Sequence, residues 1–218
     1  MRITNKKMTK KNMFEVLNRL DEKYGTEKIC YLNHDNAWQL LIATILSAQC
    51  TDARVNMVTG DLFRKYSSID AFADADVSEL AEDIRSTGFY RNKAANIIAC
   101  MRRIRDEFNY EIPSGIEELT SLAGVGRKTA NVIRGNVYDI PSIVVDTHVK
   151  RISGKLGLTE CEDSEKIEQE LMKKLPMDHW IMYNMQIIAL GRTICKAVNP
   201  DCENCFLNDL CPSGRKLR

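Results

Sequence analysis

The 218-residue sequence lacks several features that would assign a chain to a class at once. It has no run of about 18 apolar residues, so no segment predicts a membrane span. The basic N-terminal stretch, MRITNKKMTKKN, has no apolar core and does not resemble a secretory signal. No repeat of solenoid period and no low-complexity tract occurs. These absences favour a globular protein of the cytoplasm, in keeping with 44% hydrophobic and 28% charged residues.

The sequence also has almost no net charge, +1 at pH 7. That value neither requires nor excludes a nucleic-acid partner, because binding depends on where the cations cluster. Both ends of the chain are basic, and we expect them to be solvated tails. They would add at most weak attraction to phosphate, through the N-terminal stretch and through Arg215, Lys216 and Arg218.

Strand signals are almost missing, because nearly every apolar pattern repeats at helical spacing. The exception is IPSIVV at 140–145, and a single run has no partner strand for its backbone groups. We therefore interpret it as a buried extended connector. The segment 37–46, AWQLLIATIL, is apolar on nearly all sides and predicts a central buried helix. The expected fold is all-α with about ten short helices, including those over 13–20, 94–108, 164–175 and 180–191.

Cysteine, by contrast, is abundant and unevenly distributed among eight positions. Four are scattered and are interpreted as small core residues: Cys30, Cys50, Cys100 and Cys161. The other four follow the spacing C-x6-C-x2-C-x5-C: Cys195, Cys202, Cys205 and Cys211. Without an export signal, a metal centre explains them better than disulfides do. Four cysteine ligands suit zinc or a 4Fe–4S cluster, and the wide outer gaps favour iron–sulfur. Such a centre could carry electrons, or it could cross-link and stabilise a loop that buries few apolar residues of its own.

The stretch LAGVGRKTANVI at 122–133 predicts two helices joined by a tight turn that contains Gly124 and Gly126. Glycine permits a positive φ or a close backbone approach. The N–H groups at the start of the second helix attract an anion such as phosphate. These contacts would hold a nucleic-acid backbone rather than read a base sequence. A G-V-G turn alone is as often an ordinary connector, whereas G-V-G-R-K-T-A-N before an apolar helix is more specific.

Lys128 follows this turn, and two interpretations of it are open. It could be a solvated cation that supplements phosphate binding. Alternatively it is a nucleophile, because a helix N-terminus and the adjacent Arg127 disfavour the charged form of an amine. An uncharged amine can attack an electrophilic carbon and form a Schiff base. Asp146, in VVDTHVKR, predicts a helix N-cap, and such a carboxylate could also accept a proton or stabilise a cationic transition state.

Taken together, these segments resemble the endonuclease III family of DNA glycosylase/lyases in the helix–hairpin–helix superfamily. The resemblance covers nearly the whole chain, in the right order: LLIATILSAQCTD, GFYRNKAANI, GVGRKTANV, VDTHVKR and the four-cysteine loop. It implies a two-domain α-fold with DNA bound between the domains. Residues 30–140 would form a six-helix domain with the hairpin, and residues 1–29 plus 141–218 would form the iron–sulfur domain.

The resemblance implies a base excision repair enzyme in which Lys128 is the nucleophile and Asp146 the essential carboxylate. Lys128 would attack the anomeric carbon of an extruded nucleoside, expel the damaged base and cleave the strand by β-elimination. The four C-terminal cysteines would hold one 4Fe–4S cluster, with zinc less favoured. The substrate would be duplex DNA that contains oxidised pyrimidines or abasic sites, bound by a monomer.

The resemblance assigns further residues to DNA contacts. The hairpin would bind the DNA backbone through Gly124, Val125, Gly126, Arg127 and Thr129. Two residues would fill or wedge the gap left by the extruded base, although they could instead be a helix end and a loop anchor: Gln49 and Phe89. Three more match positions near the site, of which the first two could equally be helix caps: Ser47, Asp52 and His148.

The sequence departs from the commoner family pattern at three places. Thr120 stands where glutamate is frequent, Ala123 where proline is usual, and Ala189–Leu190 where a Leu–His pair is usual. These departures leave the base preference open. Two alternatives remain: a mismatch uracil or thymine glycosylase on the same scaffold, and a non-enzymatic iron–sulfur DNA-binding or redox module. The adenine-mismatch branch lacks the lysine, so Lys128 argues against it.

Overall fold

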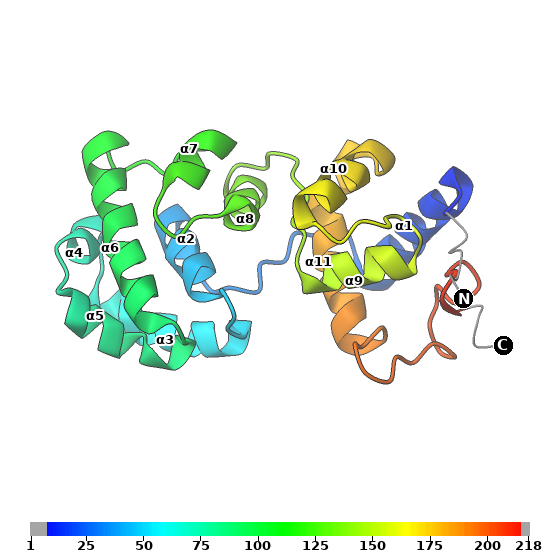
Figure 1. Cartoon of the computed structure of the whole chain (residues 1–218), viewed down its shortest axis with the longest axis horizontal. Helices are drawn as coiled ribbons and strands as arrows, with labels where there is room; N and C mark the ends of the chain where they lie inside the picture. The colour runs from blue at the N-terminus through cyan, green and yellow to red at the C-terminus, as the bar shows by residue number, and fades with distance from the viewer. Residues whose placement is uncertain (1–7, 215–218) are drawn as a thin grey trace. The chain divides into compact units, whose positions relative to one another are not determined.

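The computed structural model describes residues 8–214, which contain eleven α-helices, two short 3-10 helices and no strand. The all-α prediction is confirmed. The run at 140–145 contains no helix or strand and is mostly buried, as expected of a connector. The chain divides into two compact units, Cys30–Ile140 and Met1–Ile29 with Pro141–Arg218 (Figure 1). The proposed phosphate attraction of Arg215, Lys216 and Arg218 concerns positions outside the described residues.

The unit Cys30–Ile140 contains seven α-helices and one 3-10 helix. Asp76 starts α5 shortly after α4 ends. Its carboxylate accepts hydrogen bonds from the N–H groups of Ser78 and Glu79, each at 2.9 Å. The helices are α2 (Ala37–Leu46), α3 (Asp52–Lys65), α4 (Ile69–Ala73), α5 (Val77–Asp83), η1 (Arg85–Thr87), α6 (Tyr90–Glu107), α7 (Ile116–Ser121) and α8 (Arg127–Val137).

Helix α2 occupies the centre of this unit, as its apolar sequence predicts. Every side chain from Gln39 to Leu46 is buried, and α2 packs against α3, α6 and α8. Figure 1 shows α6 running beside α4 and α5, and its apolar stripe enters the same core. Each buried leucine or isoleucine stabilises the fold by about 1.5–3 kcal/mol. The loops that leave α2 and enter α6 and α8 therefore start from fixed points.

The other unit combines one helix that precedes this segment with helices that follow it. They are α1 (Lys10–Tyr24), α9 (Thr147–Lys155), α10 (Ser164–Lys174), η2 (Met177–His179) and α11 (Trp180–Thr193). α1 and α9 both pack against α11. Leu17 and Leu20 of α1 share a core with Tyr183 and Ile187 of α11, and all four are fully buried or nearly so. Among residues 8–214, no helix is long and apolar enough to cross a membrane.

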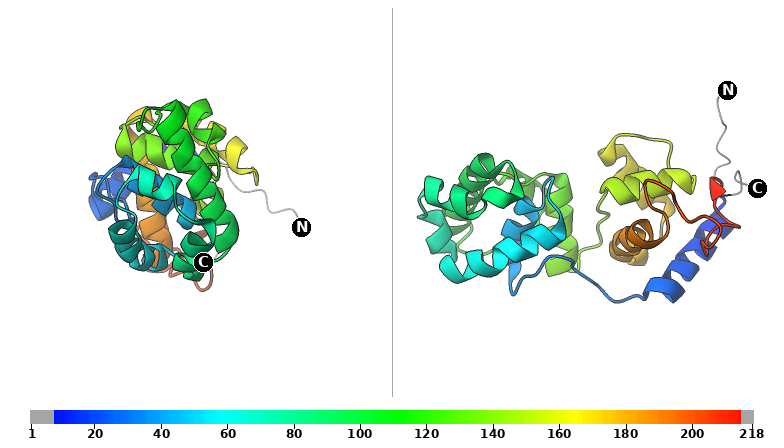
Figure 2. Two further views of the ribbon diagram at one scale, coloured as in Figure 1. Left: turned by 90° about the vertical axis from the view of Figure 1, so that its left-hand side faces the viewer. Right: turned by 90° about the horizontal axis from the view of Figure 1, so that it is seen from below.

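The segment that carries the four clustered cysteines, residues 195–214, has no α-helix and lies beside α1 (Figure 2). Arg19 of α1 donates hydrogen bonds to the backbone oxygen of Phe206 at 2.8 Å and to Asp209 at 2.6 Å. The rings of Tyr24 and Phe206 meet edge to face at 5.9 Å. Leu207 is only 1% exposed and joins the core of the unit. Polar and aromatic contacts thus attach this loop to a helix from the other end of the chain.

Candidate functional site

The glycine hairpin joins α7 to α8, and its two glycines do different things. Gly124 has φ +76°, a conformation that favours glycine, and a Cβ there would lie 3.0 Å from Cβ of Asn96 on α6. Gly126 has φ −90°, and no described atom lies within 4 Å of where its Cβ would be. Val125 between them is 5% exposed and anchors the turn in the core. Gly124 is therefore required by the protein itself, whereas Gly126 leaves open space in front of the helix.

No side chain caps the start of α8. The first backbone bond within this helix runs from the N–H of Ala130 to the oxygen of Gly126, at 2.9 Å. The N–H groups of the first turn therefore point toward the open space at Gly126. Arg127 and Lys128 are exposed here, and Thr129 is half-buried. Helix-terminal N–H groups, a gap without side chains and two cations form an arrangement that can bind a phosphate group.

Two of the family departures lie beside this hairpin. The hydroxyl of Thr120 donates within its own helix, to the backbone oxygens of Ile116 at 2.8 Å and Glu117 at 3.2 Å. Thr120 is thus exposed but directed back toward α7. Ala123 is half-buried, and the N–H of the neighbouring Val125 bonds the oxygen of Leu122 at 3.2 Å. The turn closes without a proline at position 123.

Asp146 is the N-cap of α9, as its position after an apolar run predicts. Oδ1 accepts a hydrogen bond from the N–H of Val149 at 2.8 Å. Oδ2 lies 3.4 Å from Nδ1 of His148, which is within reach of a weak contact. The side chain of Asp146 is 14% exposed and that of His148 28%. One carboxylate oxygen is therefore fixed by the helix, and the other remains accessible for proton transfer or for charge stabilisation.

Gly191 is a residue that the sequence analysis used only as the end of a helix. It lies inside α11 (Trp180–Thr193), where a Cβ would overlap Cδ2 of His148 and lie 3.1 Å from Cδ1 of Ile152. Its missing side chain therefore lets α9 and α11 approach closely and holds the His148 ring against α11. A glycine inside a helical pattern was the available signal for such a close approach.

Gln49 and Phe89 share an unusual backbone conformation. Their φ values are +54° and +50°, in the left-handed region that non-glycine residues rarely adopt. Gln49 is exposed, and Phe89 is 63% exposed although it is a large apolar residue. Phe89 therefore does not anchor its loop in the core, which removes one of the two explanations considered for it. Strained, exposed residues of this kind concentrate at functional sites.

Ser47 and Asp52 flank the loop that contains Gln49. Ser47 is the C-cap residue of α2, and its hydroxyl donates to the backbone oxygen of Thr44 at 2.8 Å. Asp52 lies in the first turn of α3, where a carboxylate interacts favourably with the helix dipole. The N-cap is Thr51, whose hydroxyl accepts from the N–H of Arg54. Ser47 thus has a capping role, and Asp52 does not.

The scattered cysteines are mostly peripheral. Cys100 is fully buried in the core of the Cys30–Ile140 unit, as predicted. Cys30 and Cys50 are half-buried against that core, and Cys161 is half-buried against the core of the other unit. Cys161 Sγ lies 3.3 Å from a carboxylate oxygen of Glu170. All eight cysteines are free thiols in the structure.

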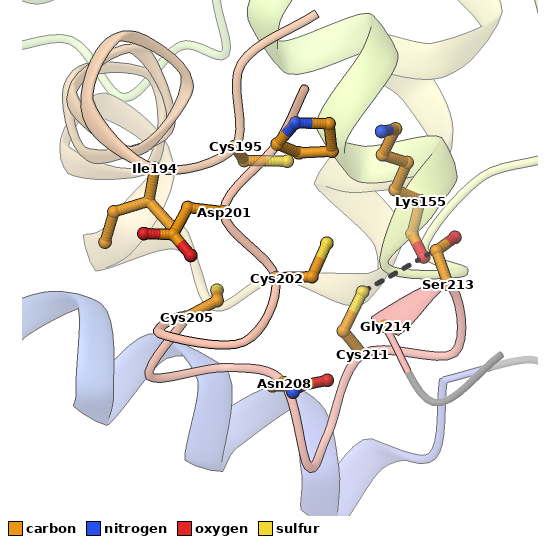
Figure 3. A pocket seen from close by; sticks show the side chains of 11 residues that line it. Lys155, Ile194, Cys195, Asp201, Cys202, Cys205, Asn208, Cys211, Ser213 and Gly214 are labelled. Carbon is orange, nitrogen blue, oxygen red and sulfur yellow. Dashed lines mark hydrogen bonds between the residues drawn. The ribbon is translucent and has the colours of Figure 1, made fainter. Parts of the chain in front are cut away.

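The four clustered cysteines surround one cavity of about 270 Å³ (Figure 3). Cys195 follows α11, and the other three lie on the loop that packs against α1. Nη1 of Arg151 lies 3.8 Å from Cys195 Sγ, and Cys211 Sγ lies 3.6 Å from the backbone oxygen of Lys155. Both contacts come from α9. The four cysteines that are close in the sequence therefore also lie around a single cavity in the structure.

The lining of the cavity fits an iron–sulfur cluster, because its four thiols match the four cysteine ligands that such a cluster takes. Burial raises the pKa of the Cys205 and Cys211 thiols, and the other clustered cysteines raise it further. Four converging thiolates therefore need a cationic group among them. Oδ1 of Asn208, buried at the same cavity, has no protein hydrogen-bond partner among the described residues.

Two family models match this chain. The model of the HhH-GPD superfamily of base excision DNA repair proteins matches residues 42–177, which include the hairpin, Lys128 and Asp146. The model of the iron–sulfur binding domain of endonuclease III matches residues 195–211, from the first clustered cysteine to the last. The protein accordingly has an iron–sulfur binding domain over these residues, with a 4Fe–4S cluster as its cofactor.

Individual relatives agree with both models. Endonuclease III of Synechocystis sp. is 49% identical over 187 residues, which cover 85% of each chain. Endonuclease III of Bacillus subtilis is 44% identical over 188 residues, or 86% of each chain. A solved structure of a trapped endonuclease III–DNA covalent intermediate matches with TM-score 0.91 and 43% identity, over 97% of this chain and 100% of that one. The chain therefore belongs to the endonuclease III family of HhH-GPD base excision DNA repair enzymes, as a DNA glycosylase/AP lyase with an iron–sulfur domain.

Proposed function

We propose that this repair enzyme removes oxidised pyrimidines from duplex DNA with Lys128 as its nucleophile. The observation that carries the proposal is the exposed Lys128 in the first turn of α8, directly after a hairpin that leaves open space at Gly126. An amine beside a bound phosphate lies close to the sugars of the same strand. The covalent endonuclease III–DNA intermediate of the structural relative supports a reaction that passes through a covalent bond between protein and DNA.

In the proposed reaction, Nζ of Lys128 attacks C1′ of a nucleotide extruded from the duplex. The bond from C1′ to the base breaks, and the base leaves with the electron pair and takes up a proton. Nζ then loses a proton, the bond from C1′ to O4′ breaks while O4′ takes up a proton, and a double bond between C1′ and Nζ completes the Schiff base. Removal of a C2′ proton then expels the 3′ phosphate by β-elimination, and water releases the lysine.

We assign the accompanying proton transfers and the stabilisation of the cationic sugar to Asp146. The N–H of Val149 holds one of its carboxylate oxygens, so the orientation of the other is defined. The weak contact with His148 supports a positioning role for that histidine, and Gly191 supports the placement of its ring. Asp146 therefore combines a structural cap with a chemical role.

We assign the DNA contacts to two groups of residues, those of the hairpin and those of the loops around Gln49 and Phe89. The hairpin would bind the backbone of the damaged strand through Gly124, Val125, Gly126, Arg127 and Thr129. Gln49 and Phe89 would enter the gap left by the extruded nucleotide, because apolar and polar side chains can replace a lost stacking partner. Ser47 and Asp52 would shape the Gln49 loop. The open space at Gly126 and the exposure of Phe89 support these assignments.

We infer that Cys30–Ile140 is the helix–hairpin–helix domain and that the remaining segments form the iron–sulfur domain. Cys195, Cys202, Cys205 and Cys211 would be the four ligands of the 4Fe–4S cluster. When bound, the cluster supplies a covalent cross-link for a loop without α-helix and a centre that can exchange an electron. The chemistry at the sugar needs only Lys128 and Asp146.

We further infer that the enzyme works as a monomer in the cytoplasm. One lysine suffices for each damaged nucleotide, so the reaction needs no second copy of the chain. The relatives reported above are bacterial, and the DNA of bacteria lies in the cytoplasm.

Borohydride trapping tests the nucleophile. Reduction of the Schiff base should link the parent protein covalently to an abasic-site duplex, whereas Lys128→Ala should lower the trapped fraction by at least about 1,000-fold. Lys166→Ala, an exposed lysine near the start of α10, is the matched control and should trap like the parent. Trapping of Lys128→Ala at the parental rate would show that another amine attacks.

A panel of single-lesion duplexes tests the substrate class. Oxidised pyrimidines such as thymine glycol should be released at least about 10-fold faster than thymine mispaired with guanine. Faster release of mismatched thymine would assign the enzyme to mismatch repair and overturn this part of the proposal.

A further inference from the structure

Lys93 is a buried lysine that the reaction described above does not use. It lies in the first turn of α6 and is only 5% exposed. Lysine is almost never buried unless its charge is paired or well hydrogen-bonded. Nζ of Lys93 donates two hydrogen bonds of 2.8 Å, to the backbone oxygens of Leu46 and Thr87. Leu46 belongs to α2 and Thr87 to η1, so Lys93 of α6 joins three separate elements.

Both acceptors are the last residues of helices. Leu46 ends α2, and Thr87 ends η1. The final carbonyls of a helix lack partners within it, and a cation at that end is favourable. Burial lowers the pKa of Lys93, and Cys50 nearby opposes this shift. The ammonium group thus satisfies two helix ends at once, and its burial is offset by these two carbonyl dipoles.

The two helix ends lead into the two strained loops. Gln49 follows Leu46 by three residues, and Phe89 follows Thr87 by two. Both are exposed, and both have a left-handed backbone, which is unfavourable for a non-glycine residue unless the surroundings impose it. The backbone oxygen of Phe89 also accepts the N–H of Lys93 at 3.0 Å, in the first turn of α6. Lys93 therefore fixes the start of each loop relative to the other.

We propose that Lys93 is a positioning residue that holds the Gln49 and Phe89 loops as one rigid element, which enters the duplex when a base is extruded. The inference rests on the proposed function, because it assigns both loops to the gap in the DNA. A pre-set pair of loops lowers the cost of ordering them at the moment of extrusion. Lys93 touches neither substrate nor sugar in this scheme, so its effect should fall on extrusion of a paired base.

The experiment compares two reactions of the intact holoenzyme under single-turnover conditions. One is release of thymine glycol from a duplex, which requires extrusion of a base. The other is strand cleavage at a preformed abasic site, which has no base to extrude. 2-Aminopurine placed opposite the lesion reports, by its fluorescence, how far the opposite base is unstacked.

Lys93→Met removes the ammonium group and keeps a side chain of similar length. We expect base release to fall on the order of 100-fold, because a misplacement of about 1 Å can have that effect. Cleavage at the abasic site should change by less than about 3-fold, and the rise in 2-aminopurine fluorescence should weaken. Lys93→Arg, which keeps the cation but moves its donors, should lose base release to a smaller extent.

Arg102→Met is the matched control. Arg102 lies on the same helix, α6, and its Nε donates to the backbone oxygen of Ala73, the last residue of α4, at 2.6 Å. It therefore caps a helix end in the same way but leads into neither loop. This variant should lower thermal stability and leave both reactions and the fluorescence signal close to those of the parent.

Three results would overturn the inference: an equal loss of both reactions in Lys93→Met, an unchanged fluorescence signal, or the same selective loss in Arg102→Met. If Lys93→Met fails to fold, Lys93→Arg becomes the test variant. Base release at the parental rate in Lys93→Arg, together with a weakened fluorescence signal, would also contradict the inference. A parent protein that neither releases thymine glycol nor traps on abasic DNA would instead refute the proposed function.

Discussion

The two units of this protein differ in what holds their functional residues in place. In Cys30–Ile140, Lys128 and the two strained loops stand at the ends of helices that share a core of 28 buried apolar residues. In the other unit, the described core has 17 such residues, and the cysteine loop contributes only Leu207 to it. The first site is thus built on packed helices. The second is built on a loop that depends on polar ties and, we propose, on the cluster that it binds.

The same chain therefore holds its functional residues in place in two different ways. A helix end positions a side chain through the packing of its apolar face, which is set before any ligand binds. A loop without α-helix lacks that support, and cross-linking through four cysteines replaces it. Mutations should therefore affect the two regions in different ways.

The largest expected effect is on the cysteine loop. Cys205→Ser should reduce bound iron from about four atoms per chain to less than about one, because serine does not replace a thiolate ligand. The loop should then become accessible to protease, because it has no α-helix and Leu207 is the one apolar side chain among its described residues that is fully buried. Iron analysis, visible absorption and limited proteolysis measure these changes.

Cys161→Ser is the control for this prediction, because Cys161 belongs to the same unit and bonds Glu170 rather than the cavity. It should retain iron and protease resistance. Full iron content in Cys205→Ser would show that this residue is not a ligand.

Substitutions of the two hairpin glycines should have effects of intermediate size. Gly124→Ala should lower the free energy of unfolding by about 1–2 kcal/mol, because φ +76° disfavours a side chain and the Cβ would crowd Asn96. Gly126→Ala should change stability by less than about 0.5 kcal/mol, since its Cβ would meet no described atom.

DNA affinity should separate the two variants. Gly126→Ala fills the space before α8 and should weaken binding of an abasic-site duplex by about 10-fold, through loss of one or more backbone N–H contacts. Thermal melts and fluorescence anisotropy provide the two measurements. Undiminished affinity in Gly126→Ala would mean that no phosphate occupies this space.

The smallest expected effect is the pH dependence of the stability that His179 contributes through its contact with α1. His179 bonds Asp178 at 2.8 Å and Asp21 of α1 at 3.0 Å. Burial lowers the pKa of His179, but these two carboxylates outweigh it and raise the pKa above 6.5. The stabilisation from the charged histidine is therefore complete below pH 6.5 and is lost as pH rises through the higher folded-state pKa.

We expect this contribution to remain below about 1 kcal/mol, because the imidazole is partly solvated. The melting temperature of the parent should exceed that of His179→Gln most clearly in mild acid, and the difference should shrink toward alkaline pH. A difference that grows with pH would show that the histidine is neutral in the folded protein.

Much of the fold followed from local sequence. The apolar sequence at 37–46 predicted the buried helix α2 with its bounds, and the stripe at 94–108 predicted most of α6. Asp146 was predicted as an N-cap from its place after an apolar run. These features depend on periodicity and on short-range hydrogen bonds, which neighbouring residues determine.

Other features required contacts between segments far apart in the chain. The left-handed backbone at Gln49 and Phe89 has no glycine to signal it, and Lys93 reads as one more exposed cation until its burial is known. The need for a glycine at position 191 is visible only in the structure, where His148 of another helix lies against it. Such contacts depend on how packed helices bring residues together, which no local pattern encodes.

The sequence by itself determined the helical class, the approximate positions of the main helices, the two-glycine turn with the lysine that follows it, and the set of four clustered cysteines. Spacing and residue type are enough for these. Only the tertiary structure decided that one buried ammonium group joins two helix ends and that four thiols surround a single cavity. The physical reason is that burial and convergence are properties of the packed chain, because they arise when distant segments exclude water from the same place.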